Sequence, residues 1–92
     1  MRIIEAGRIY LVKNFSGNGY QEIKFNRKRY DGTYSEGTTV EELLRVLRDK
    51  FYHFDRIAPS PYNKAVIEYL DGSIRCCLLR LDEKKELLKD KE

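Results

Sequence analysis

Two basic side chains near the end of the chain, Arg80 and Lys84, have the spacing most suggestive of ligand binding. They are four residues apart, so a helix would place them side by side on one face, where like charges repel each other. A shared phosphate would relieve that repulsion by accepting charge-assisted hydrogen bonds from both side chains. Glu83, three residues from Arg80, supports the plainer interpretation that this is an ordinary solvated face. On these residues alone, the plainer interpretation is the stronger one.

Aromatic rings and one amide form a second candidate group. Positions 51–54 read Phe-Tyr-His-Phe, and a helix cannot bury all of these rings on one side. The two outer rings continue an apolar stripe, so Tyr52 or His53 must point elsewhere, where a ring could stack on an adenine or contact another protein copy. Asn63 follows Pro61 and precedes a helix, which suits an N-cap or turn residue and also allows a ligand contact by a free amide end.

A basic and aromatic segment occupies residues 24–30. Basic side chains are interleaved there with two rings, in the order Lys24, Phe25, Arg27, Lys28, Arg29 and Tyr30. This mixture suits contact with single-stranded nucleic acid, and the same donors could reach a phosphate in a pocket of the hairpin. The plainest interpretation, an edge strand that its charges protect from aggregation, is the strongest of the three.

Missing motifs and composition argue against several classes of function. The chain has no Cys–His or Ser–His signature, no phosphate-binding loop and no metal-ligand spacing, so we expect no catalysis and no cofactor. Two cysteines and one histidine are too few for a structural zinc site. The net charge of +3 permits an anionic partner but argues mildly against nucleic acid.

Location and assembly follow from other features. No apolar stretch approaches the roughly 20 residues that span a bilayer, and the start of the chain shows no secretory leader. Cys76 and Cys77 are adjacent and offer no disulfide framework, which indicates a reducing compartment. We therefore expect a cytoplasmic protein without a membrane partner. A chain of 92 residues has a thin core, so we also expect a homo-oligomer.

Residues 1–36 are expected to be rich in β-structure. Segment 8–13 is β-branched and aromatic, segment 14–19 carries turn residues, and segment 20–25 alternates in polarity. Asp31-Gly32 marks a further turn. Two or three antiparallel strands fit this pattern best.

Residues 37–92 are expected to form a helical hairpin. Thr38 and Thr39 each have capping-box spacing to a following glutamate, and an apolar stripe follows at helical spacing. The first helix must stop before the segment Pro59-Ser60-Pro61, because proline disfavours helix at the residue before it.

The second half of the hairpin admits two interpretations. Apolar residues from Ile67 to Leu81 recur at steps of three and four, as in an amphipathic helix. Asp71-Gly72 lies among them and is a strong signal for a β-hairpin. We favour a helix because the period continues unchanged through the glycine. The fold class is then α+β, a single domain over 1–92 with a small N-terminal antiparallel sheet followed by a two-helix antiparallel hairpin.

Several stretches together resemble a known phage family. They are 3–7, 9–15 and 19–25, then Gly37-Thr38-Thr39 with Glu41-Glu42, and a turn containing Pro59 and Asn63 that is followed by Ile67, Leu70, Ile74 and Arg80. This pattern resembles the Thoeris anti-defence sponges, whose helical hairpin is shared with the anti-CBASS sponges. The resemblance covers most of the chain.

The resemblance implies a phage protein that works in the host bacterial cytoplasm. Such a protein binds and sequesters cyclic nucleotide immune signals without cleaving them; the ligands are cyclic ADP-ribose isomers and, in some members, cyclic oligonucleotides. Their pockets lie between protomers, so a homo-oligomer is implied.

The residues that the family uses for binding can be matched one by one. Its asparagine after the turn and its two arginines one helical turn apart correspond to Asn63, Arg80 and Lys84. Its pocket aromatic falls on His53, with Phe54 beside it. To these we add Arg27 and Lys28, the strand residues that could supply further phosphate donors.

The chain departs from the family at some of these positions. Pro61-Tyr62 replaces an Arg-Glu pair, and Lys84 replaces the second arginine, which gives up bidentate recognition of phosphate. Cys76 stands where a tryptophan is common. Two other functions therefore stay in view: a small single-stranded nucleic-acid-binding module that uses residues 24–29, and a protein-interaction module that uses the apolar surface of the hairpin.

Overall fold

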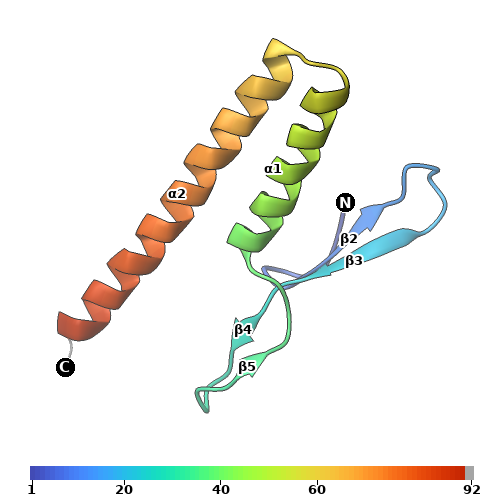
Figure 1. The fold of residues 1–92 in the computed structure, drawn as a ribbon. Helices are drawn as coiled ribbons and strands as arrows, with labels where there is room; N and C mark the ends of the chain where they lie inside the picture. Colours follow the sequence, from blue (N-terminus) through green and yellow to red (C-terminus); the bar gives the residue numbers. More distant parts are fainter. Residues whose placement is uncertain (91–92) are drawn as a thin grey trace. The chain divides into compact units, whose positions relative to one another are not determined.

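The computed structural model describes the backbone of residues 1–90 and the side chains of residues 1–86. Five short strands are followed by two helices, which confirms the expected α+β class (Figure 1). The chain divides into two compact units, Met1–Thr39 and the helical part that begins at Val40.

The β-rich unit contains a three-stranded antiparallel sheet. Its strands β1 (Arg2–Glu5), β2 (Ile9–Lys13) and β3 (Tyr20–Lys24) are hydrogen-bonded to one another in that order. Between β2 and β3, Gly17 and Gly19 adopt positive φ angles of 84° and 80°, a region open to glycine at little cost. The turn expected at 14–19 is therefore present.

A separate two-stranded ladder follows, made of β4 (Arg27–Lys28) and β5 (Tyr34–Ser35). In the turn between them, the Asp31 carboxylate accepts the backbone N–H of Thr33 at 3.0 Å and its hydroxyl at 2.6 Å. These hydrogen bonds, the hydroxyl first, lower the pKa of Asp31. The expectation of two or three strands was too low, because a two-residue strand is too short to show a polarity period.

The segment that leads into the helices passes very close to β3. The backbone N–H of Thr38 donates to Lys24 O at 2.8 Å, and that of Asn26 donates to Thr38 O at 3.0 Å. A Cβ atom on Gly37 would collide with the backbone of Phe25. Glycine is therefore required at position 37 by close approach of two backbone segments, and not by an unusual φ angle.

The helical unit is an antiparallel pair (Figure 1). Helix α1 (Val40–Ile57) begins directly after Thr39 and ends before Pro59, as expected. Helix α2 (Pro61–Asp90) is continuous through Gly72. The helical interpretation of this segment is therefore confirmed, and the β-hairpin alternative is wrong.

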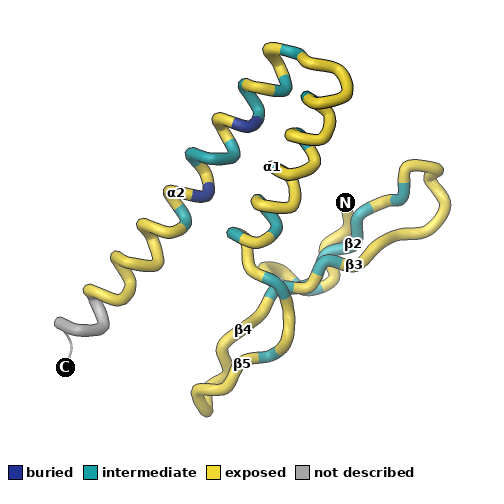
Figure 2. Tube along the Cα trace, in the orientation of Figure 1, coloured by how far each residue is buried: buried dark blue, intermediate teal, exposed yellow. Residues whose placement is uncertain are grey.

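Contacts between the two helices explain that outcome. Ile67 and Ile74 are the buried hydrophobic residues of the described chain, at 8% and 6% exposure (Figure 2). Arg48 on α1 and Asp71 on α2 form an ion pair at 2.7 Å between Nη1 and Oδ1, which raises the pKa of the Arg48 guanidinium. Asp71 is thus used as a helical partner of α1 and not as a turn residue.

Candidate functional site

Polar contacts around Asp55 hold the connection between the helices. The Asp55 carboxylate accepts the backbone N–H of Ser60 at 2.9 Å and pairs with the Lys64 ammonium at 3.1 Å. Ser60 caps α2, because its Oγ accepts the backbone N–H of Tyr62 at 3.1 Å. The Ser60 N–H first, and then Lys64, hold the pKa of Asp55 below its ordinary value of 3.8.

Asn63 belongs to this connection as well. Its side chain is half-buried, and Nδ2 donates to the carbonyl oxygen of Ala58 at 3.2 Å. The expected turn role is therefore present, while the N-cap position belongs to Ser60. The amide nitrogen of Asn63 is engaged inside the turn of its own chain.

Arg80 and Lys84 lie one turn apart on α2, and both are exposed. Neither forms a hydrogen bond or an ion pair with any residue of the described chain, although Glu83 and Glu86 are close in sequence. Helix α2 has 30 residues and α1 has 18, so the last turns of α2 continue past the first residue of α1 (Figure 1). Among residues 1–86, no carboxylate is therefore paired with either cation, so an anion would not have to displace one of these carboxylates.

Asn63 and Arg80 lie near opposite ends of the region where the helices pack. They are 17 residues apart on one helix, which corresponds to about 25 Å at a rise of about 1.5 Å per residue. No single phosphate or ribose can be reached from both ends of that span. A binding site that contains both residues therefore needs a second copy of the chain.

The two aromatic candidates lie on α1. His53 is exposed and lies two residues before Asp55, which contacts α2; that spacing corresponds to about 200° around a helix. His53 is therefore on the side of α1 away from α2. Phe54 is 41% exposed, but its ring meets Phe51 edge-on at 5.4 Å and has the Lys50 ammonium 4.8 Å from its centre. Phe51 and Lys50 therefore already cover part of this ring.

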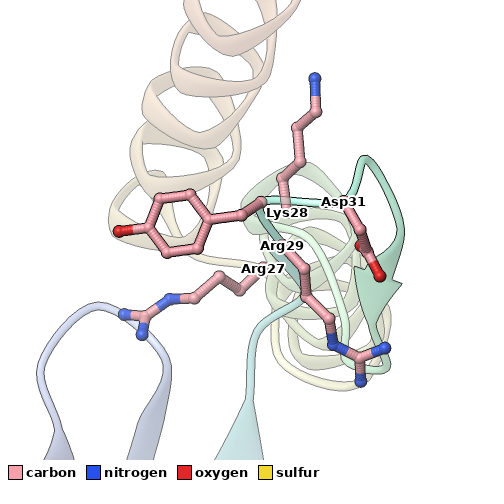
Figure 3. A pocket seen from close by; sticks show the side chains of 5 residues that line it. Arg27, Lys28, Arg29 and Asp31 are labelled. Carbon is pink, nitrogen blue, oxygen red and sulfur yellow. The ribbon is translucent and has the colours of Figure 1, made fainter.

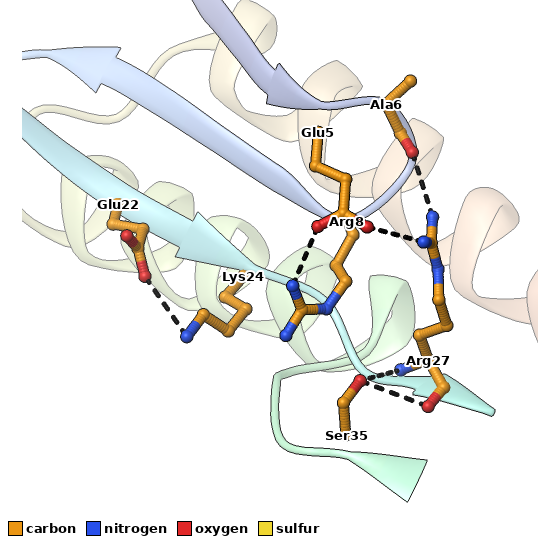
Figure 4. A network of polar contacts seen from close by, with 7 residues as sticks. All are labelled: Glu5, Ala6, Arg8, Glu22, Lys24, Arg27 and Ser35. Carbon is orange, nitrogen blue, oxygen red and sulfur yellow. Dashed lines mark hydrogen bonds and ion pairs between the residues drawn. The ribbon is translucent and has the colours of Figure 1, made fainter. Parts of the chain in front are cut away.

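Arg27 is engaged within the β-rich unit (Figure 4). Its Nη1 pairs with Glu5 Oε1 at 2.6 Å, and its Nη2 donates to Ala6 O at 3.2 Å. Arg8 binds the other oxygen of the same carboxylate at 2.9 Å. The Arg8 hydrogen bond has the largest part in lowering the pKa of Glu5. Arg27 is therefore first of all a structural cation that joins β4 to the β1–β2 turn.

Lys28 lines an open depression of about 460 Å³ together with Arg27, Arg29, Tyr30 and Asp31. The three labelled basic side chains leave the backbone of β4 and the residue that follows it in different directions (Figure 3). They do not converge on one point, as donors to a single phosphate would. Tyr30 is fully exposed beside them.

One surface of α2 was not predicted from the sequence. We call it the outer stripe, and it consists of Tyr62, Ala65, Tyr69, Gly72, Cys76 and Leu79. These residues recur at steps of three and four, but on the side of the helix opposite to Ile67 and Ile74. The heptad spacing of Tyr62, Tyr69 and Cys76 was a visible signal that a second apolar stripe was present.

No family model, curated protein or solved structure matches this chain. Within the described residues, no group of three or more His, Cys, Asp or Glu side chains is placed to hold a metal ion. Neither helix, over its described length, is sufficiently long and apolar to cross a lipid bilayer.

Proposed function

We propose that this protein binds a cyclic nucleotide signal and sequesters it without cleaving it, as the resemblance to the Thoeris anti-defence sponges implies. Cyclic ADP-ribose isomers are the first ligand class, and cyclic oligonucleotides the second. The protein would act in the bacterial cytoplasm as a phage product, and as a homo-oligomer.

The observation that carries this proposal is the state of Arg80 and Lys84. Both are exposed, one turn apart, and without an acidic partner in the described part of the helical unit. Two cations that repel each other on one face are stabilised by a shared anion. The phosphates of a nucleotide supply such an anion, and sequestration needs no catalytic group.

The distance from Asn63 to Arg80 determines how the site would be built. Because about 25 Å of helix separates them, the ligand would contact Arg80 and Lys84 of one copy and the turn of another. His53 lies on the side of α1 away from α2. We therefore assign it a smaller contribution to ligand binding than the resemblance implies. Arg27 contributes mainly to the β-rich unit through Glu5.

A thermal-shift screen of the purified protein tests the proposal. The panel holds cyclic ADP-ribose isomers, cyclic dinucleotides and cyclic trinucleotides, with linear ADP-ribose and a single-stranded oligonucleotide as controls. A ligand at about 100 times its Kd stabilises the folded state by about 2.7 kcal/mol, which is readily measured as a raised Tm. We expect a shift with one cyclic class and recovery of that ligand intact after heating.

A charge-reversal pair locates the site. Arg80→Glu should weaken binding by about 100-fold or more, because a charge-assisted contact is replaced by repulsion. Lys85→Glu is the matched control, since it makes the same charge change on a neighbouring exposed residue that lies elsewhere around α2. If Arg80→Glu binds the ligand as tightly as the unmodified chain does, the assignment of the site to Arg80 is wrong. If no cyclic nucleotide in the panel raises the Tm, the proposed function is wrong.

A second candidate function, contact with single-stranded nucleic acid, is favoured by one observation. Lys28, Arg29 and the fully exposed Tyr30 lie together at the β4–β5 hairpin, and such a mixture of cations and rings suits stacked bases. The affinity should then fall steeply with salt and be weakened by Tyr30→Ala. Failure to bind an oligonucleotide at low salt would exclude it.

A further inference from the structure

The outer stripe of α2 is apolar, and four of its six residues are exposed, whereas Ala65 and Gly72 are half-buried. Tyr62, Tyr69 and Leu79 keep 81%, 76% and 60% of their surface exposed. A helix that packs on a single partner shows one apolar stripe, whereas α2 has a second one on the opposite side. Gly72 lies in the middle of this stripe, and a Cβ atom there would meet nothing within 4 Å. Nothing in the described part of its own chain therefore requires a glycine at this position, which alanine would serve better in a helix.

When a second copy of the outer stripe runs antiparallel to the first, large side chains of one copy lie opposite small ones of the other. Written forward, the order is Tyr62, Ala65, Tyr69, Gly72, Cys76, Leu79. Against a reversed copy, Tyr69 meets Gly72, Ala65 meets Cys76, and Tyr62 meets Leu79. Each ring is then opposite a glycine or a leucine, and never opposite another tyrosine. The central Gly72 leaves room for the ring of Tyr69 from the second copy, as knobs-into-holes packing requires.

We infer that two copies of this chain pair through their outer stripes, antiparallel, in the register that places Tyr69 of each copy against Gly72 of the other.

The charges beside the stripe favour this orientation. Glu68 and Arg75 lie on the same flank of the stripe, seven residues apart. In the antiparallel register, Glu68 of each copy comes beside Arg75 of the other, which gives two pairs of opposite charge across the interface. In a parallel pair, Arg75 would instead lie beside Arg80 of the second copy, and the rings of Tyr69 would meet each other. Like charges at these positions disfavour the parallel form.

The available area is large enough for a specific dimer. Two copies contribute four tyrosine rings from positions 62 and 69, and a tyrosine buries about 150–200 Å² when covered. These rings alone supply more than half of the roughly 1,000 Å² that a biological interface needs. Leu79, Ala65 and Cys76 add to this area from both copies.

The pairing stands independently of the proposed function. The centre of the register lies between residues 70 and 71, so Arg80 of one copy comes level with residue 61 of the other along the helix axis. Asn63 precedes Ile67 by four residues and so shares its side of α2, away from the outer stripe. The pairing therefore brings Arg80 near the start of the other copy's α2, but it does not bring Arg80 to Asn63.

Disulfide trapping tests the register without any ligand. In a Cys77→Ser background, Ala65→Cys is combined with the native Cys76 and the protein is oxidised. The antiparallel register places these two sulfurs opposite each other, and the absence of a native cysteine at 65 gives a clean comparison. We expect a covalent dimer in which peptide mapping finds the 65–76 link.

Matched controls separate the possible orientations. Ala65→Cys with both native cysteines replaced by serine, and Cys76 alone, should form little dimer, because each would face itself only in a parallel pair. Equal cross-linking in these controls, or none in the 65–76 variant, would overturn the register. Because no nucleotide is added, this result is independent of whether the ligand screen succeeds.

A second measurement applies if the cysteine variants fail to fold. Sedimentation should show a dimer of the unmodified chain, and Tyr69→Ala should raise its dissociation constant by at least about tenfold, because the central rings are lost. Tyr52→Ala, which removes a half-exposed ring from α1, is the control and should leave the dissociation constant unchanged. A monomer at all concentrations, or equal effects of the two variants, would contradict the inference.

Discussion

Replacing Gly72 by alanine gives a prediction whose sign depends on the state of association. The residue lies in the interior of α2, eleven positions after Pro61. Its φ angle is not positive, and an added Cβ atom would meet nothing within 4 Å. In a single chain, therefore, only helix propensity changes, and alanine is better than glycine by about 1 kcal/mol.

That free energy corresponds to a large thermal shift in a small domain. A change of about 1 kcal/mol moves the Tm of a domain of 60–100 residues by about 4–8 °C. At about 1 µM, where a weak dimer dissociates, we expect Gly72→Ala to melt higher than the unmodified chain by this amount. Circular dichroism at the helical band measures it. Ala65→Gly, the reverse exchange on the same helix, should lower the Tm comparably.

At high protein concentration, the Tm of Gly72→Ala should no longer exceed that of the unmodified chain by this amount. The Cβ atom would occupy the space that receives Tyr69 of the second copy, so the dimer weakens and the Tm of the variant rises less with concentration than that of the unmodified chain. A lower Tm of Gly72→Ala at dilution would refute the reasoning, because it would mean that Gly72 has a contact within its own chain. A gain that is the same at every concentration would refute the pairing.

Two further predictions concern the hairpin. Ile74→Ala removes a side chain that is only 6% exposed and should destabilise the hairpin by about 2–4 kcal/mol in urea unfolding at low concentration. Leu79→Ala, at 60% exposure, should change it little, and equal losses would show that Ile74 is not in the core. Because the pKa of Asp55 is held below 3.8, its contribution to stability is complete above that pH and is lost as the pH falls through the lowered pKa. Asp55→Asn should therefore show less acid destabilisation than the unmodified chain between about pH 6 and pH 2, and identical acid profiles would contradict this account.

The order of strands and helices could be predicted because its signals are local. Glycine and asparagine at 14–19 mark a turn, and the threonines before Val40 mark a helix start. The close approach of Gly37 to Phe25 could not be predicted in this way. It depends on two segments whose relative path is set by hydrogen bonds between Lys24, Asn26 and Thr38.

The candidate site also has features that local spacing predicts and features that depend on tertiary contacts. The spacing of Arg80 and Lys84 was legible in the sequence, since side-chain neighbours four apart follow from the helix period. The sequence could not show that these two cations have no carboxylate partner within the described chain, because Glu83 is equally close in sequence. The position of His53 on the far side of α1 also depends on which face of that helix meets α2.

The segment around Asp71-Gly72 shows what each level of information determined. The sequence by itself established an apolar period of three and four through this segment, which favoured a helix, but it also contained a turn dipeptide that allowed a β-hairpin. Only the tertiary structure decided between them: Arg48, 23 residues away, pairs with Asp71, and Ile67 and Ile74 are buried. The physical reason is that a local period records which side chains share a face, whereas the free energy that selects helix over hairpin comes from contacts with distant residues.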